Sequence, residues 1–181
     1  MDCFIDTKNW VSIEELIEHS KFADFVISDT KEALEDYSFK QFLAGAHCPV
    51  FLIHRNFEKP DRVILAYDET PSSIYALKLY SYIFPQWHLL NSALLSINPK
   101  LQTENEQHLK QWLFLHFNNL SIHLLKGDLK KELIEFIGEE ASQSLIVMGA
   151  FGRKGLAALF HNSLSNTLLE ETNASLFIAH H

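Results

Sequence analysis

The sequence predicts an α/β protein built on a doubly wound, parallel sheet. Short apolar segments alternate with longer segments of helical periodicity, and this alternation is typical of βαβ units. One apolar segment, Leu145–Met148, has no polar residue, as expected of a strand that is buried on both faces of a parallel sheet. Three of the six glycines follow it within seven residues, as expected of a loop at the carboxyl end of such a strand.

The first 56 residues are predicted to form only part of such a unit. A helix is expected over Trp10–His19, because its apolar residues fall on one face and Ser12 with Glu15 forms a capping box. A second, shorter helix is expected over Phe39–Leu43 and ends near Gly45. The predicted strands are Phe25–Ile27, Val50–Ile53 and a short one at Cys3–Ile5.

Residues 57–61 are polar apart from Phe57, contain a proline and form the predicted linker to a second unit, residues 62–181. Five strands are predicted there: Val63–Tyr67, Ala93–Ile97, Ser121–Leu125, Leu145–Met148 and Ser175–Ala179. Polar caps and helix breakers delimit the helices between them, so that Thr70 or Ser72 begins the first and Asp128 begins the third. The predicted helices run from Thr70 or Ser72 to Phe84 and over Glu104–Phe117, Leu129–Ile137 and Ser163–Glu171.

Residues 1–56 also resemble the later part of residues 62–181. The matching segments are Phe25–Ile27 with Leu145–Val147 and Val50–Ile53 with Leu176–Ala179, in the same order. The first copy is shorter between these segments, and Asp29 stands where the second copy has Gly149. Because a carboxylate would repel a phosphate, we expect the first copy to be a partial unit that binds no phosphate.

The ends of two predicted strands indicate a candidate site. Asp68 follows the first strand of the second unit, and Gly149 follows the fourth. Ligands of doubly wound sheets bind beyond the carboxyl ends of the strands, so these residues share one crevice if their strands are neighbours. The glycine loop carries Arg153 and leads to a helix start at Ser163, and both features favour an anion such as phosphate. A simple turn between a strand and a helix is the alternative.

These motifs resemble those of the universal stress protein family, whose hallmark is a strand followed by Gly-x2-Gly-x9-Gly-Ser/Thr. The corresponding segment reads Gly149-x2-Gly152-x9-Asn162-Ser163. The family's first strand usually ends in an aspartate, matched by Asp68, and its last strand commonly follows Cys-Pro-Val, matched by Cys48–Val50. The resemblance covers residues 62–181 as a full domain and residues 1–56 as the later part of another.

The resemblance implies a five-stranded sheet of order 3-2-1-4-5, preceded by the partial copy of the same fold. It implies ATP or a related adenine nucleotide as ligand, and leaves open whether Mg²⁺ accompanies it. In ATP-binding members, the aspartate contacts the nucleoside, the end of the second strand offers backbone to adenine, and the glycine loop and helix start hold the ribose and phosphates. Carried over by position, the nucleotide-binding residues are Ala66, Tyr67, Asp68, Ile97, Met148, Gly149, Gly152, Arg153, Asn162, Ser163, Leu164 and Ser165.

Asn162 departs from the family pattern, which has a third glycine there. Asparagine tolerates left-handed geometry and caps helices, so the backbone can be kept, but its side chain would occupy space near the phosphates. Two functions follow: a nucleotide-binding module in the stress response, or a nucleotide-free dimerisation or interaction scaffold with a relic glycine loop. An enzyme is least favoured, because the sequence has neither a P-loop nor a nucleophile elbow; at most, slow incidental ATPase activity is expected.

Composition narrows the expected partners. The net charge of −8 disfavours binding to nucleic acid or to an anionic membrane surface. The sequence shows neither a membrane-spanning apolar run nor a secretory signal, so the cytoplasm is the expected location. Its ten histidines are scattered without the spacing of metal ligands, so we expect no metal site.

The last strands of the two copies predict how the chain assembles. Family members pair edge to edge through their last strands, and an uncovered apolar strand at a sheet edge invites pairing. We therefore expect residues 1–56 to pack on the second unit through Val50–Ile53, and we expect a homodimer or higher oligomer. The alternative is a monomer in which the first copy lies along the second unit.

Overall fold

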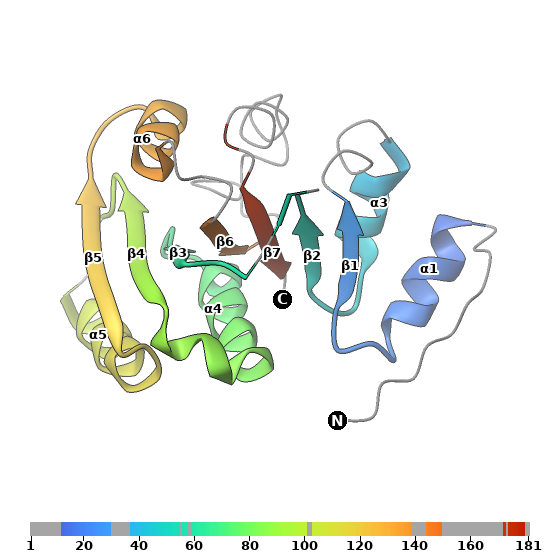
Figure 1. Ribbon diagram of the computed structural model, residues 1–181, viewed down its shortest axis with the longest axis horizontal. Coiled ribbons are helices and arrows are strands. Elements are labelled where there is room, and N and C mark those ends of the chain that lie inside the picture. Colours follow the sequence, from blue (N-terminus) through green and yellow to red (C-terminus); the bar gives the residue numbers. More distant parts are fainter. Residues whose placement is uncertain are drawn as a thin grey trace.

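The computed structural model describes residues 12–29, 37–54, 56–57, 59–100, 103–138, 144–149, 172 and 174–179. Its strands are β1 (Val26–Asp29), β2 (Val50–Ile53), β3 (Arg62–Ala66), β4 (Asn91–Ile97), β5 (Asn119–Leu125), β6 (Ser144–Gly149) and β7 (Ser175–Ala179). They form one sheet in the order β1-β2-β7-β6-β3-β4-β5 (Figure 1). Neighbouring strands are parallel except β2 and β7, which are antiparallel. The protein is therefore an α/β protein with a mostly parallel sheet, as predicted.

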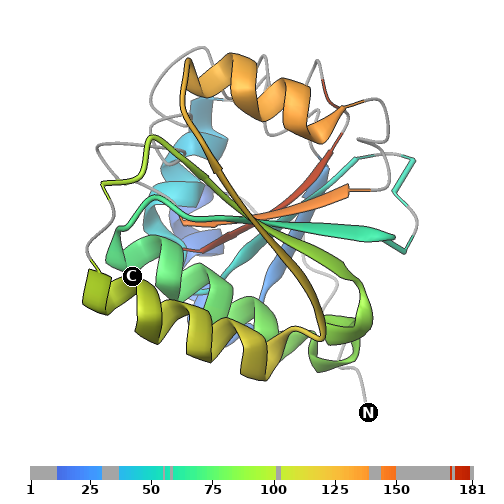
Figure 2. The same ribbon diagram turned by 90° about the vertical axis from the view of Figure 1, so that its left-hand side faces the viewer.

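Helices cover both faces of this sheet. They are α1 (Ile13–Ser20), α3 (Tyr37–Gly45), α4 (Pro71–Ile83), α5 (Thr103–His116) and α6 (Leu129–Ile137), with a 3-10 helix, η1 (Pro85–Leu89). α6 lies on one face and α4 and α5 lie on the other (Figure 2). Apolar residues of α1, α3 and α6 share one core with alternate strand residues, and those of α4 and α5 share a second core with the remaining ones. This arrangement explains why β3, β6 and β7 contain no polar side chain after their first residue.

Side-chain caps begin three helices where the sequence places them. Ser12 accepts a hydrogen bond from the N–H of Glu15 at 3.2 Å, and Asp128 accepts one from the N–H of Lys131 at 3.0 Å. Thr70, the first of the two predicted candidates, caps α4 by accepting from the N–H of Ser73 at 3.2 Å. Each cap satisfies a backbone donor that the helix itself leaves unpaired.

The element limits differ from the predicted ones at several ends. The first strand of the second unit ends at Ala66, so Tyr67 lies in the following loop. β4 begins at Asn91, two residues before the predicted start, and η1 follows Pro85 where only a helix break was predicted. Proline supplies the fixed φ that a first helical residue needs, so it ends one helix and begins another. The predicted strand Cys3–Ile5 and helix Ser163–Glu171 lie outside the described residues.

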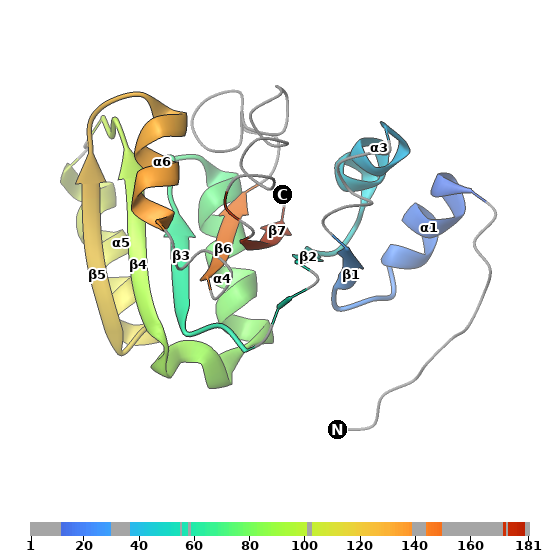
Figure 3. The ribbon, with the colours of Figure 1, turned by 45° about the horizontal axis from the view of Figure 1, so that its top comes forward.

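The sheet has seven strands, because β2 joins the five strands of the second unit through β7. Figure 3 shows β2 and β1 continuing the sheet beyond β7, with α1 and α3 beside them. The predicted packing of residues 1–56 through Val50–Ile53 is therefore confirmed. Among the strands that follow residue 61, the order is β5-β4-β3-β6-β7.

The registers of the strands place the segments that match in sequence at equivalent positions in their pairs. Val26 lies opposite Val50 in the pair β1–β2, and the matching residues Ile146 and Leu176 lie opposite each other in β6–β7. Where β2 meets β7, Phe51 lies opposite Phe177, which is its own match in the repeat. The flanking pairs, Val50 with Ile178 and Leu52 with Leu176, are equivalent under exchange of the copies. The two phenylalanines thus mark a local two-fold axis.

Aromatic side chains pack at the junction between β2 and β7. The centroid of the Phe51 ring lies 6.4 Å from the ring centroid of Phe177, 5.4 Å from that of Phe57 and 6.3 Å from that of Trp87. Phe51 is only 4% exposed, so these contacts are made away from water. Phe57 belongs to the predicted linker, which therefore contributes to the core instead of only connecting two units.

The prediction of oligomers through the last strands needs correction. β2 lies between β1 and β7, and β7 lies between β2 and β6. Both strands already have a partner on each side, so neither offers a free row of backbone groups to a second copy. An oligomer of this chain would have to use another surface.

Candidate functional site

The predicted site residues that follow β3 and β6 lie at the same edge of the sheet. β3 pairs in parallel with β6, with Leu65 opposite Val147, and this confirms that the two strands are neighbours. The chain continues from β3 toward β4 on one side and from β6 toward β7 on the other, so the strand order reverses here. Open α/β sheets bind their ligands at such a switch point.

Asp68 has one satisfied and one unsatisfied carboxylate oxygen. Its Oδ1 accepts hydrogen bonds from the Thr70 N–H at 3.1 Å and from the Thr70 hydroxyl at 2.6 Å. Its Oδ2 is buried and has no hydrogen-bond partner among the described residues. Buried polar atoms in folded proteins are nearly always paired, so this oxygen is a strong candidate for a ligand contact. Thr70 holds the carboxylate in place for that role.

Gly149 brings the end of β6 against the first turn of α4. A Cβ atom on this residue would lie 2.5 Å from the carbonyl carbon of Ser72 and 2.6 Å from the backbone nitrogen of Ser73. Both distances are far below van der Waals contact, so only glycine allows this approach. The amino-terminal end of α4, where the helix dipole is positive, is thereby fixed beside the switch point.

Two loops at this edge contain residues in left-handed backbone conformations. Glu69, after β3, has a φ of 64°, and Asn98, after β4, has a φ of 54°. Glu69 Oε1 accepts a hydrogen bond from the N–H of Lys100 at 2.9 Å and so ties the two loops together. The side chain of Asn98 exchanges two hydrogen bonds with the backbone of Gly127, at 2.8 and 3.1 Å. Such conformations persist where surrounding contacts enforce them, often at functional sites.

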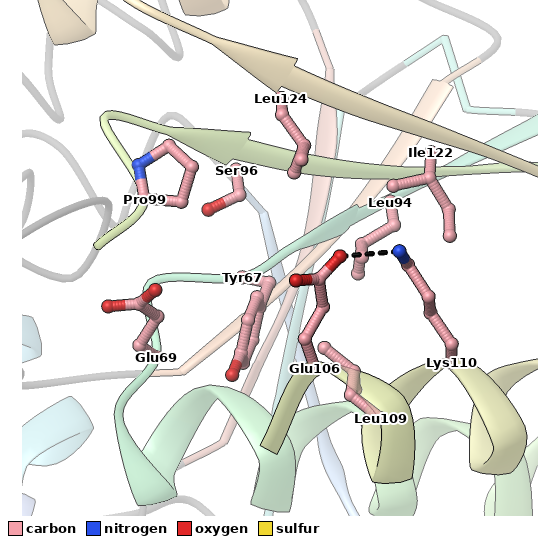
Figure 4. Close-up of a pocket in the computed structure, with 10 residues that line it drawn as sticks. All are labelled: Tyr67, Glu69, Leu94, Ser96, Pro99, Glu106, Leu109, Lys110, Ile122 and Leu124. Carbon is pink, nitrogen blue, oxygen red and sulfur yellow. Dashed lines mark hydrogen bonds and ion pairs between the residues drawn. The ribbon is translucent and has the colours of Figure 1, made fainter. Parts of the chain in front are cut away.

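A cavity of about 160 Å³ lies beside this edge, between the strands β4 and β5 and the helix α5 (Figure 4). Five of its ten lining residues are apolar, and Tyr67 and Glu69 line it on the side of the switch point. Burial is the main cause that raises the pKa of the Tyr67 hydroxyl, and the nearby carboxylates of Glu69 and Asp68 raise it further. Tyr67 is therefore neutral at physiological pH. Ser96 lines the same cavity with a hydroxyl that has no partner within the described part of the chain.

A wider groove of about 550 Å³ adjoins this cavity between α4 and α5. Tyr67, Glu69 and Leu109 line both spaces, so the two lie next to each other. Aromatic side chains from both helices, Tyr82 and Trp112, line the remainder of the groove.

The structure brings together Ala66, Tyr67, Asp68, Met148 and Gly149, with Ile97 on the next strand over. Ile97 packs into the core beneath α6, and its side chain does not line the cavity. The other predicted nucleotide-binding residues are Gly152, Arg153, Asn162, Ser163, Leu164 and Ser165, and they lie outside the described residues.

Sequence reasoning missed Thr70, Glu69 and Ser96. Thr70 was considered only as a helix cap, although it also orients Asp68. Ser96 gave a signal that could have been used, because it is a polar residue inside an otherwise apolar strand segment. Glu69 gave none, since its contact with Lys100 joins loops that are distant in sequence.

In the ranges that the structure describes, no group of three or more His, Cys, Asp or Glu side chains is placed to hold a metal ion. Within the same ranges, no helix has the length and apolar character needed to cross a membrane.

Comparison with known proteins finds similarity in structure only. No family model and no curated protein matches the sequence. The fold resembles a universal stress protein from Archaeoglobus fulgidus DSM 4304, with a TM-score of 0.66 and 17% identity over 93% of this chain and 64% of that one. It also resembles a putative universal stress protein from Pseudomonas aeruginosa UCBPP-PA14, with a TM-score of 0.57 and 14% identity over 96% of this chain and 69% of that one.

This chain thus spans less than two thirds of the length of the Archaeoglobus protein. The 93% coverage exceeds residues 62–181 alone, so the similarity also includes residues before Arg62. At this level of identity the comparisons establish a shared fold, that of these universal stress proteins.

Proposed function

We propose that this chain is a universal stress protein that binds ATP or a related adenine nucleotide at the switch point between β3 and β6. The observation that carries the proposal is the buried Asp68 Oδ2, which lacks a partner among the described residues. An ionised carboxylate only accepts hydrogen bonds, so this oxygen calls for a donor from a ligand. The hydroxyls of a ribose and the amino group of an adenine are donors of that kind.

The neighbouring backbone is suited to the charged end of the same ligand. Gly149 fixes the amino-terminal end of α4 at this edge, and a positive helix end favours phosphate. We assign the phosphates to the glycine loop, with Gly152 and Arg153, and to the helix start at Asn162–Ser165. Ile97 and Ala66 would flank the nucleoside from the strand ends.

We further propose that residues 62–181 are a complete domain, that residues 1–56 are a partial copy of it, and that 57–61 link them. The equal registers of β1–β2 and β6–β7 support a shared origin of the two strand pairs. Asp29 ends β1 where Gly149 ends β6, so the nucleotide is assigned to the second unit alone. The proposed role is binding in a stress response in the cytoplasm, without a catalytic function.

The ligand released from purified protein tests this proposal. Protein would be denatured after exhaustive buffer exchange, and the released material separated and identified by mass spectrometry. The proposal predicts an adenine nucleotide in amounts that approach one per chain from wild-type protein and far less from Asp68→Ala. Equal traces from both proteins would contradict it.

A nucleotide-free interaction scaffold remains the second candidate, and exposed apolar side chains on α4 and α5 favour it. Leu115 is 81% exposed, Phe114 is 60% exposed and Tyr82 is 58% exposed. Exposed apolar surface of this kind is typical of protein association sites. If this surface joins two copies, light scattering will give a dimer mass that Leu115→Lys reduces to that of a monomer. A monomer mass for the unaltered protein at tens of micromolar would count against self-association.

A further inference from the structure

The hydroxyl of Ser96 is an unusual feature of β4. Ser96 is only 1% exposed, and its Oγ has no hydrogen-bond partner in the part of the chain that the structure describes. Ser92 lies on the same face of the same strand and is also buried, but its Oγ donates to the carbonyl oxygen of Leu90 at 3.2 Å. An unpaired buried hydroxyl destabilises the folded state, so its presence at Ser96 needs a reason.

Ser96 lines the cavity of about 160 Å³ between the sheet and α5 (Figure 4). Leu94, Ile122 and Leu124 from the strands and Leu109 from the helix supply apolar walls. A cavity of about 150 Å³ with aliphatic walls is large enough to bind benzene. The space beside Ser96 therefore accommodates one small ring, and the layered walls of sheet and helix favour a flat one.

The charged groups around the cavity are already engaged with one another. Glu106 and Lys110 form an ion pair along α5. Glu69 accepts a hydrogen bond from the backbone N–H of Lys100 at 2.9 Å. A charged ligand would have to compete with these contacts, whereas an uncharged one leaves them intact. The surroundings thus select against a charged ring.

A bound water is the simplest other occupant for the Ser96 hydroxyl. Buried waters usually make about three hydrogen bonds to groups that lack partners. Ser96 is the one lining residue, among those described, whose buried polar atom lacks a partner. A water on Ser96 would leave the apolar walls formed by Leu94, Leu109 and Ile122 without a partner, whereas a ring with one polar atom fills that space as well.

We infer that this cavity is a binding site for a small, uncharged, planar ring that places one hydrogen-bonding atom on the Ser96 hydroxyl. The ring belongs either to a free small molecule or to the base of a nucleotide, since Tyr67 is shared between the cavity and the switch point. Both sources have the same chemistry at Ser96. The inference stands on the cavity and on Ser96, and does not require that nucleotide binds at Asp68.

Phenol is a suitable probe, with benzene as the ring without a polar atom. Binding would be followed on the full chain by NMR, through the methyl signals of Ile122 and Leu124. We expect saturable shifts with phenol and about fivefold weaker binding of benzene, the effect of one neutral hydrogen bond. Ser96→Ala should lower phenol affinity to that of benzene, while the matched variant Ser92→Ala should bind phenol as the unaltered protein does.

Thermal stability gives a second readout that needs no ligand. Ser96→Ala removes an unpaired hydroxyl and should leave Tm unchanged or raise it, whereas Ser92→Ala removes a paired one and should lower Tm. No saturable phenol binding, equal affinity for phenol and benzene, or a Ser96→Ala protein as destabilised as Ser92→Ala would overturn the inference. Displacement of phenol by ATP would identify the ring as a nucleotide base, and phenol binding unaffected by ATP would identify a free ligand.

Discussion

Replacing Gly149 by alanine tests the close approach of β6 to α4 on which the site depends. The added Cβ would lie 2.5 Å from the carbonyl carbon of Ser72 and 2.6 Å from the nitrogen of Ser73. These are backbone atoms of the first turn of α4, so no side-chain rotation relieves the clash. Overpacking of this kind costs about 1–3 kcal/mol, and an immovable backbone neighbour places Gly149→Ala near the upper limit.

A loss of about 3 kcal/mol in the free energy of unfolding should lower Tm by roughly 6–12 °C in a chain of this size. Urea unfolding followed by circular dichroism measures the loss directly. Gly45→Ala is a matched control, because the Cβ there would meet the end of the Ile17 side chain at 2.7 Å, and that side chain can move. The higher helix propensity of alanine offsets part of this contact, so we expect a change within about 1 kcal/mol.

A Gly149→Ala protein as stable as the unaltered one would show that the end of β6 is not packed against α4 as described. Equal losses for Gly149→Ala and Gly45→Ala would also contradict this packing, because they would remove the distinction between backbone and side-chain neighbours.

Three further predictions address the junction, the glycine loop and the free thiol. Phe51→Asp buries an unpaired charge where β2 meets β7 and should lower the free energy of unfolding by several kcal/mol. The same change at Phe22, which is 91% exposed, should leave the free energy of unfolding nearly unchanged. Similar losses for the two variants would argue against the junction between β2 and β7. Asn162→Gly should tighten ATP more than adenosine in titrations if the side chain limits phosphate approach, and equal effects on both ligands would exclude that role. Burial, with a smaller contribution from the carboxylate of Asp24, raises the pKa of the Cys48 thiol to about 11, so a smaller fraction of Cys48 is thiolate at pH 8. In a Cys3→Ser background, iodoacetamide should therefore alkylate Cys48 roughly a hundredfold more slowly than a free cysteine. Equal alkylation rates would contradict this raised pKa.

Much of the fold was predictable because local signals and the global fold agree. Asp128 and Gly138 bound α6 at the predicted limits, and β7 was predicted residue for residue. The strand pairing of residues 1–56 was predictable from Val50–Ile53, since an apolar last strand needs a neighbour. Element ends were less certain; the start of β4 at Asn91 depends on pairing with β3 and β5, which the sequence does not reveal.

The candidate site was only partly predictable, for a physical reason. Asp68 and Gly149 could be predicted as site residues because each lies at or just after the carboxyl end of an apolar strand. The contact between Glu69 and Lys100 and the unpaired hydroxyl of Ser96 arise from packing between elements distant in the chain. The edge-to-edge oligomer failed as a prediction because the internal pairing of β2 with β7 uses the strands that it required.

Calorimetric titration of ATP into the full chain, with and without magnesium, measures nucleotide binding at Asp68. We expect saturable binding to the unaltered protein and an affinity lowered roughly tenfold or more in Asp68→Ala, because a charge-assisted hydrogen bond is lost. Asp61→Ala, which removes an exposed carboxylate just before β3, should bind ATP normally. No binding under either condition, or an affinity that Asp68→Ala leaves unchanged, would contradict nucleotide binding at Asp68.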